Sequence, residues 1–290
     1  MADNPSISVI VRSMARPGLT RALESICTQQ YESLETLVVD AKGGGQADIA
    51  AIGGIGDSGA KLILQGKPLS RAAAANVGLQ AAANECVIFL DDDDFFEPGH
   101  LQDLARTLSE HPDCDAAYCG ARILLKDGSR VAEFNFPFNR VNLLNENFLV
   151  IHSVLFRRGL LANGAGFDES LDVYEDWDFW IQLSMQTNFA YSGKINATYI
   201  ADAGVSGMGL AGNRDQPRQD AQRAAIHAKW AAPFAALRTA FESARTQALA
   251  ARDAGRSEEF NRWQRELIDI SRGARGLAIA AEYATCNGSG

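Results

Sequence analysis

The sequence predicts an α/β domain with a doubly wound, mostly parallel sheet, followed by a helical C-terminal extension. Short apolar runs at residues 7–11, 36–39, 61–64 and 87–90 alternate with helical spacing at 19–29 and 71–83. Strands connected through helices in this way run parallel, with right-handed crossovers. Beyond residue 213 only helical stripes follow, and 290 residues suffice for one large domain with a smaller appendage.

Turn and cap signals separate these elements. Residues 16–18 predict a turn, and Ser70 is the expected N-cap of the helix over 71–83. The glycines at 43–45 lack the spacing and the Lys-Ser/Thr ending of a phosphate loop, so they predict a flexible connection. Further expected elements are a short helix at 48–52, a helix at 101–109, strands at 116–118 and 122–125 closed by a turn at 127–128, and an irregular segment at 135–147.

Charge divides the chain near residue 210. From Arg214 onward there are twelve Lys or Arg and nine Asp or Glu, so this part carries +3 and the preceding part −12. The predicted organisation is a domain at 1–205, a glycine-rich linker or lid at 206–213, and a helical extension at 214–290. Within the extension, Pro233 and Gly255 bracket one helix, and apolar residues from Phe260 to Leu277 mark another.

Composition excludes several classes of protein. Hydrophobic residues make up 47% and charged residues 22%, which is typical of a globular protein. A net charge of −9 argues against a nucleic-acid partner. There is no transmembrane or signal-type segment, and the five cysteines form no CxxC pair, so we expect reduced thiols and a cytoplasmic location. Peripheral membrane contact and a homo-oligomer formed through the C-terminal helices are left open.

Four consecutive carboxylates, Asp91 to Asp94, directly follow the apolar run at 87–90. Ligands of open α/β sheets bind outside the carboxyl ends of strands, so this position indicates a site. Crowded carboxylates repel one another, and Mg²⁺ or Mn²⁺ is the natural compensation. In an extended chain, Asp91 and Asp93 would face one way and Asp92 and Asp94 the other. The alternative is a solvated acidic turn.

A second acidic cluster lies in YEDWDFW at 174–180. The spacing of its tryptophans predicts a helix that continues to Met185, with Glu175 and Asp176 in the first turn. Acids at a helix start interact favourably with the helix dipole, which accounts for Glu175 and Asp178 structurally. That explanation does not preclude a general base at Asp176.

Four ordered motifs resemble one known family. They are ISVIVRSMARPGLTRALESICTQQYESLETLVVD, RAAAANVGL, VIFLDDDDFFEPGHL and GFDESLDVYEDWDFWIQL. They resemble the family 2 inverting glycosyltransferases of GT-A fold over roughly residues 6–200, and the C-terminal helices lie outside the likeness. The resemblance implies a metal-dependent, inverting, hexosyltransferase-type enzyme. Such an enzyme moves sugar from a nucleoside-diphosphate sugar of UDP or dTDP type to a hydroxyl of a polysaccharide, glycolipid or protein.

The resemblance also implies roles for individual residues. Asp176 resembles the general base, and Asp93 resembles the ligand of the Mn²⁺ or Mg²⁺ ion. Asp91 is implied to contact ribose or to support the metal shell. The residues implied to bind the donor are Ser13 through its backbone, Asp40 and Arg71 at the base, and Asp91 and Asp92.

The sequence departs from the family pattern in two places. The first loop reads Arg12, Ser13, Met14, Ala15 where Pro-Thr-Tyr-Asn is common, so base stacking at Met14 is not expected, and Arg12 either reaches a phosphate or lies at the surface. After the last motif, the family usually has an Arg or His near a serine, whereas residues 203–206 of this sequence contain only the serine. The lack of a Gln-x-x-Arg-Trp motif argues against a processive synthase.

Two other functions stay open at this point. One is a catalytically decayed protein that binds nucleotide-sugars or acts as a scaffold on the same fold. The other is a sugar nucleotidyltransferase, for which RSMARPGL is a poor match because it lacks the expected glycine-rich basic loop.

Overall fold

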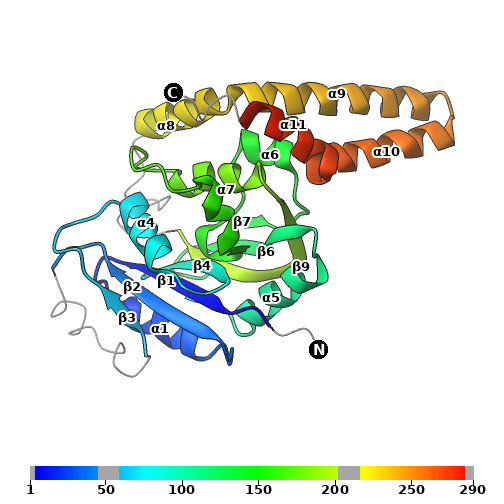
Figure 1. The fold of residues 1–290 in the computed structure, drawn as a ribbon. Coiled ribbons are helices and arrows are strands. Elements are labelled where there is room, and N and C mark those ends of the chain that lie inside the picture. The colour runs from blue at the N-terminus through cyan, green and yellow to red at the C-terminus, as the bar shows by residue number, and fades with distance from the viewer. Residues whose placement is uncertain (1–3, 45–58, 202–215, 285–290) are drawn as a thin grey trace.

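The computed structural model describes residues 4–44, 59–201 and 216–284. The helix expected at 48–52 and the linker or lid expected at 206–213 lie outside these ranges. Within them, helices cover both faces of a mixed sheet, and a set of C-terminal helices lies along one side (Figure 1). The predicted fold class, an α/β domain with a central sheet flanked by helices and with a helical C-terminal extension, is confirmed.

The described part of the chain forms one nine-stranded sheet with the order β3-β2-β1-β4-β8-β6-β9-β5, and β7 pairs with β6. The first four strands in this order are parallel, as predicted from the alternating pattern. They are β1 (Ile7–Ser13), β2 (Leu34–Asp40), β3 (Lys61–Ile63) and β4 (Cys86–Asp91). Parallel and antiparallel pairings mix in the other strands: β5 (Phe95–Phe96), β6 (Cys114–Leu124), β7 (Arg130–Phe134), β8 (Val154–Arg157) and β9 (Asn188–Ile200).

Two hydrophobic cores fill the spaces above and below the sheet. Along β1, Ile10 packs into one core while Val9 and Val11 pack into the other, as the alternation of a strand requires. One core is covered by α1 (Leu19–Cys27) and α5 (His100–Glu110). The other is covered by α4 (Arg71–Ala81), α6 (Arg140–Asn145) and α7 (Glu175–Ser184).

The second half of the domain differs from the sequence prediction. The strands expected at 116–118 and 122–125 are one strand, β6, which continues through Gly120. A Cβ on Gly120 would lie 2.9 Å from the Phe134 carbonyl oxygen, so glycine there allows β7 to approach. The turn expected at 127–128 is confirmed, with Gly128 at φ 83°. Strands β7 and β9 were not predicted, and the segment expected to be irregular contains α6, capped by Asn139.

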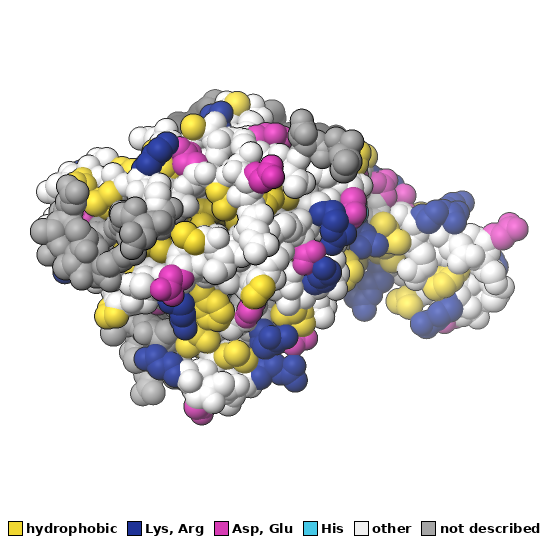
Figure 2. Space-filling view, turned by 90° about the horizontal axis from the view of Figure 1, so that it is seen from below, with side chains coloured by type: hydrophobic (Ala, Val, Ile, Leu, Met, Phe, Trp, Pro, Cys, Tyr) yellow, Lys and Arg dark blue, Asp and Glu magenta, His cyan; other side chains and the backbone are white. Residues whose placement is uncertain are grey.

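The extension contains four helices within the described residues: α8 (Gln216–Lys229), α9 (Ala231–Asp253), α10 (Ser257–Arg272) and α11 (Ala274–Ala284). The prediction for α9 is confirmed, with Pro233 in its first turn and Gly255 just beyond its end at φ 68°. The stripe expected as one helix is two, because the chain breaks at Gly273. Helix α8 was not predicted. The distal halves of α9 and α10 stand clear of the sheet domain in Figures 1 and 2.

Hydrogen bonds and ion pairs join α8 and the start of α9 to the sheet domain. Asp178, fully buried in α7, accepts from Lys229 Nζ at 2.9 Å and from Trp230 Nε1 at 2.8 Å. Gln222 of α8 accepts hydrogen bonds from the backbone N–H groups of Asp172 and Val173. These contacts therefore attach the extension to the sheet domain next to the first turn of α7.

Among the described helices, none combines the length and the apolar character that crossing a bilayer requires. Four cysteines in the described residues are free thiols, and three of them are buried: Cys86, Cys114 and Cys119.

Candidate active site

A cavity of about 540 Å³ opens beside the carboxyl ends of β1 and β4. Its charged walls come from these strand ends, from the start of α4 and from the first turn of α7. The residues are Arg12, Arg16, Arg71, Asp91, Asp93, Glu175 and Asp176. The run Asp91 to Asp94 and the Glu175-Asp176 pair, which are far apart in the sequence, therefore contribute to one cavity.

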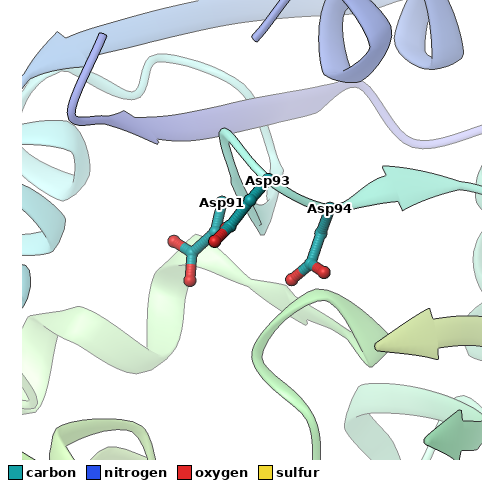
Figure 3. A group of neighbouring side chains, drawn as sticks. All are labelled: Asp91, Asp93 and Asp94. Carbon is teal, nitrogen blue, oxygen red and sulfur yellow. The ribbon is translucent and has the colours of Figure 1, made fainter. Parts of the chain in front are cut away.

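The acidic run is a turn rather than an extended strand. Strand β4 ends at Asp91, and the chain turns through Asp92 and Asp93 before β5. As a result the carboxylates of Asp91, Asp93 and Asp94 point to the same side (Figure 3) and have oxygens within 4.8 Å of one another. The side-chain directions expected for an extended chain are found for Asp91, Asp92 and Asp93 but not for Asp94, which lies on the side of Asp91 and Asp93.

Asp92 is buried beneath the turn and stabilises the loop after β1. Its carboxylate accepts hydrogen bonds from Ser13 Oγ at 3.0 Å, from Met14 N at 2.7 Å and from Arg16 N at 3.2 Å. Arg16 Nη1 adds an ion pair at 3.0 Å. This carboxylate is fully buried and is used by the protein itself, so the structure gives Asp92 the role of positioning residues 13–16.

Arg12 lies between the two acidic groups. It is directly opposite Asp91 in the register of β1 and β4, and it donates Nε and Nη2 to the two Asp91 oxygens at 2.7 and 2.8 Å. Its Nη1 reaches Glu175 Oε1 at 3.1 Å. Although burial alone favours the protonated acid, the Arg12 charge holds the pKa of Asp91 below its usual value. Arg12 is thus a buried residue that bridges Asp91 and Glu175 and does not lie at the surface.

Asp93 and Asp94 provide the remaining negative charge at the turn. Burial, followed by repulsion from Asp91 and Asp94, raises the pKa of Asp93 to about 7, although Arg16 Nη1 lies 2.9 Å from its Oδ2. Asp94 Oδ2 is buried, has no hydrogen-bond partner among the described residues, and lies 3.4 Å from His152 Nδ1.

This donor set fits a hard divalent cation. Clustered carboxylate oxygens are the ligands that Mg²⁺ and Mn²⁺ prefer, and a bound cation would lower the raised pKa of Asp93 and balance the charge of the buried Asp94 carboxylate. Arg12 already occupies both oxygens of Asp91, whereas Asp93 contacts Arg16 through Oδ2 and Asp94 has His152 at 3.4 Å from its Oδ2.

Asp176 lines the opposite wall. Its Oδ1 accepts from the backbone N–H of Trp177 at 2.8 Å, and Asn147 Nδ2 donates to Oδ2 at 3.3 Å. The preceding Tyr174 adopts a left-handed conformation at φ 62°, which turns the chain sharply into α7. Burial, followed by the neighbouring charge of Glu175, raises the pKa of Asp176 to about 7. Such a carboxylate is suited to accept a proton near neutral pH.

The structure brings Arg71 to the cavity but places Ser13 and Asp40 elsewhere. Arg71 donates to the Asp172 carbonyl at 2.6 Å and pairs with Glu175 at 3.3 Å. Asp40 is buried and accepts from the N–H of Gly43, while its neighbour Ala41 lines the cavity. Ser13 is buried against Asp92. Nucleotide contacts by Ser13, Asp40 and Asp92 stay predictions that would involve backbone or rearranged side chains.

Sequence reasoning missed three residues that line this cavity. Asn147 lies in the segment expected to be irregular, and Tyr199 lies on the unpredicted strand β9. Arg223 of α8 lies over the rings of Tyr174 and Trp177, at 5.6 and 5.8 Å from their centroids. No local pattern marks these residues. The asparagine-rich composition of 135–147 fits either an acceptor-site lining or a sheet edge and does not decide between them.

A mixed, helix-flanked sheet that carries a carboxylate cluster at the end of a central strand is the GT-A fold. The profile of the family described as "Glycosyl transferase family 2" matches residues 8–163, which is more than half of the chain. The chain therefore belongs to glycosyl transferase family 2.

Relatives of known sequence agree with this assignment. The chain is similar to glycosyltransferase YwdF of Bacillus subtilis, with 27% identity over 61% of this chain and 68% of that protein. It is also similar to the O-antigen biosynthesis protein RfbC of Myxococcus xanthus, with 27% identity over 65% of this chain but only 15% of that protein.

Among solved structures, TarS of S. aureus has the same fold. The superposition has a TM-score of 0.58 at 22% identity and covers 68% of this chain but only 37% of TarS. A shorter form of TarS, solved in complex with UDP-GlcNAc, gives a TM-score of 0.57 at 23% identity and covers 69% of this chain and 59% of that one. This chain thus spans well under two thirds of the TarS chains that it matches.

Proposed function

We propose that the protein is an inverting, non-processive, hexosyltransferase-type glycosyltransferase that uses a nucleoside-diphosphate sugar. The observation that carries this proposal is the pairing of two acidic groups on one cavity. One is a carboxylate cluster suited to a cation, and the other is Asp176, a single carboxylate with a pKa of about 7. Inverting transfer is a single displacement, in which the acceptor hydroxyl attacks as the diphosphate leaves. It therefore needs one site that holds the leaving diphosphate and one base that takes the proton of the hydroxyl.

Asp176 is the proposed base. It would accept the proton of the acceptor hydroxyl as the hydroxyl oxygen attacks the anomeric carbon of the donor. The Trp177 N–H and Asn147 fix its carboxylate, so its position does not depend on substrate. Glu175 would stay in place as the anion that Arg12 and Arg71 bind.

The carboxylate cluster is the proposed place of the leaving diphosphate. Asp93 and Asp94 would hold the divalent cation, and Arg12 would keep Asp91 in position beside them. A cation bound there supplies charge stabilisation to the diphosphate as the glycosidic bond breaks. Arg16 and Arg71, which also line the cavity, are available to meet phosphate oxygens.

A uridine donor is favoured over a deoxythymidine donor. The support is that TarS, a protein of the same fold, has been solved with UDP-GlcNAc and with UDP. The proposed acceptor is a hydroxyl of a glycan, a lipid-linked sugar or a protein.

Calorimetric titration with UDP, dTDP and GDP, each with Mn²⁺ and again with EDTA, tests this proposal directly. We expect UDP to bind with Mn²⁺ and to lose most of its affinity in EDTA, because a cation held by the carboxylate cluster would offset the negative charge of the diphosphate. Binding of none of the three nucleotides would favour a decayed or scaffolding protein instead.

Asp93→Asn should weaken metal-dependent UDP binding by at least about tenfold, since one charged oxygen ligand of the cation is lost. Asp113→Asn, at an exposed aspartate in the turn between α5 and β6, is the matched control and should bind UDP as the parent does. Equal binding by both variants would contradict the role of Asp93.

The rate of transfer should rise with pH and level off above about 7. The reason is that Asp176 must be deprotonated to act as a base, and its pKa is raised to about 7. Activity should therefore fall about tenfold for each pH unit below 6 at saturating Mn²⁺ and donor. An acid limb centred near pH 4, the ordinary value for aspartate, would show that another group is the base.

A further inference from the structure

The cavity has an apolar half that the proposed chemistry does not use. It is formed by the β6–β7 hairpin and the segment before β8, and we call it the apolar wall: Ile123, Val131, Ala132, Phe134 and Phe148. None of these side chains carries a polar atom. Arg223 and Glu146 also line the cavity, and they form a long ion pair with each other at 4.0 Å.

The apolar wall continues into the carboxylate cluster. Ala132 of β7 lies opposite Ile123 of β6, which lies opposite Tyr199 of β9. Tyr199 also lines the cavity, and its pKa is raised by burial and then by the carboxylates of Asp94, Asp91 and Asp93. One row of cross-strand neighbours therefore leads from the hairpin to the acidic turn.

The apolar wall also extends to the proposed base, Asp176. Asn147, which donates to Asp176, is followed in the chain by Phe148. A hydroxyl that is hydrogen-bonded to Asp176 would therefore have its parent molecule beside Phe148. The acceptor, rather than the diphosphate, is the substrate that meets this surface.

Exposed hydrophobic side chains gather where the apolar wall reaches the surface. Val131 is 58% exposed, and Phe136, which is 37% exposed, packs on Phe148 with ring centroids 4.9 Å apart. Contiguous apolar surface next to a cavity is typical of a binding site. Sugar hydroxyls laid on such a surface would lose hydrogen bonds to water without replacement, whereas alkyl groups would gain from burial.

We propose that the acceptor carries an alkyl chain, as a lipid-type aglycone does, and that the apolar wall binds this chain while the acceptor hydroxyl meets Asp176. This inference rests on the proposed function. A cavity of about 540 Å³ is the size of a single small-ligand site. A chain longer than a few carbons must therefore leave through the mouth, and Val131 extends the apolar path outward.

Calorimetric titration of the protein with UDP and Mn²⁺ present tests the proposal, with octyl, phenyl and methyl β-D-glucopyranoside as probes below their micelle concentrations. We expect the octyl glycoside to bind at least about tenfold more tightly than the methyl glycoside, which burial of two methylenes is enough to give. Binding of the phenyl glycoside as tight as that of the octyl glycoside would overturn the alkyl assignment. Equal binding of all three would overturn the proposal.

Two substitutions at Val131 and one distant control locate the effect. Val131→Asp should remove the octyl preference, and Val131→Leu should keep it. Leu249→Asp replaces a hydrophobic residue of α9 that is 40% exposed, and it should behave as the parent. Equal losses in Val131→Asp and Leu249→Asp would overturn the assignment to the apolar wall. UDP binding without an octyl preference would refute only this inference, whereas the absence of nucleotide binding would refute the proposed function.

Discussion

Asp176→Asn will bind UDP and Mn²⁺ as the parent does and will transfer sugar at least about a hundredfold more slowly. Asparagine keeps the shape of the side chain and can still accept from the Trp177 N–H through its amide oxygen, so the first turn of α7 is preserved. What it loses is the ability to take up a proton. The measurement is the transfer rate at saturating donor, together with UDP affinity by calorimetry.

The control for this variant is Asp253→Asn, at the exposed end of α9. It should transfer at the parental rate. Asp176→Asn should also lose the acid limb of the pH profile at about 7, because the group responsible for that limb is gone. Turnover within about threefold of the parent in Asp176→Asn would refute the base assignment, whatever the effect on binding.

The two acidic groups form a single electrostatic unit because Arg12 bridges them. Asp91 and Glu175 belong to elements more than 80 residues apart in the sequence, yet each is held by the same guanidinium at 2.7 and 3.1 Å. One side chain of β1 therefore links the carboxylate cluster, which is the proposed cation site, to the helix turn that carries the proposed base. A lysine at this position could not make both the bidentate contact and the bridge.

Local sequence patterns could predict where the clustered carboxylates lie but not which direction each side chain takes. The apolar run before Asp91 predicted a strand end, and a strand end predicted a ligand edge. The turn after β4, however, sends Asp92 inward to the loop of residues 13–16, whereas Asp91 and Asp93 line the cavity and Asp94 is buried beside them. Because the four residues are identical, the sequence does not indicate which of them faces inward. That direction depends on contacts across the sheet.

The unpredicted parts of the site are those that depend on tertiary packing. Strand β9 has mixed polar and apolar residues because its two faces change from buried to exposed along its length, so no single period appears. Arg12 gained its role only through its register with Asp91. Arg223 reaches the cavity from α8, beyond the region covered by the family likeness, and nothing in the sequence near it indicates a partner.

Asp178→Ala is expected to produce the largest loss of stability, about 2–4 kcal/mol. Asp178 is fully buried and accepts from three donors, Lys229, Trp230 and Gln182. Removing the carboxylate leaves the Lys229 charge and the indole N–H of Trp230 without this acceptor at the junction of α8 and α9. The check is the free energy of unfolding from urea denaturation, measured beside Asp253→Asn.

The same substitution should reduce transfer, although Asp178 is not among the residues that line the cavity. Helix α8 holds the backbone at Asp172 and Val173 through Gln222, and these residues lead into the left-handed turn that places Asp176. Loosening α8 should therefore lower the transfer rate more than the affinity for UDP. An unfolding free energy within about 0.5 kcal/mol of the parent would show that the extension is held mainly by other contacts, and parental turnover would show that it does not position the base.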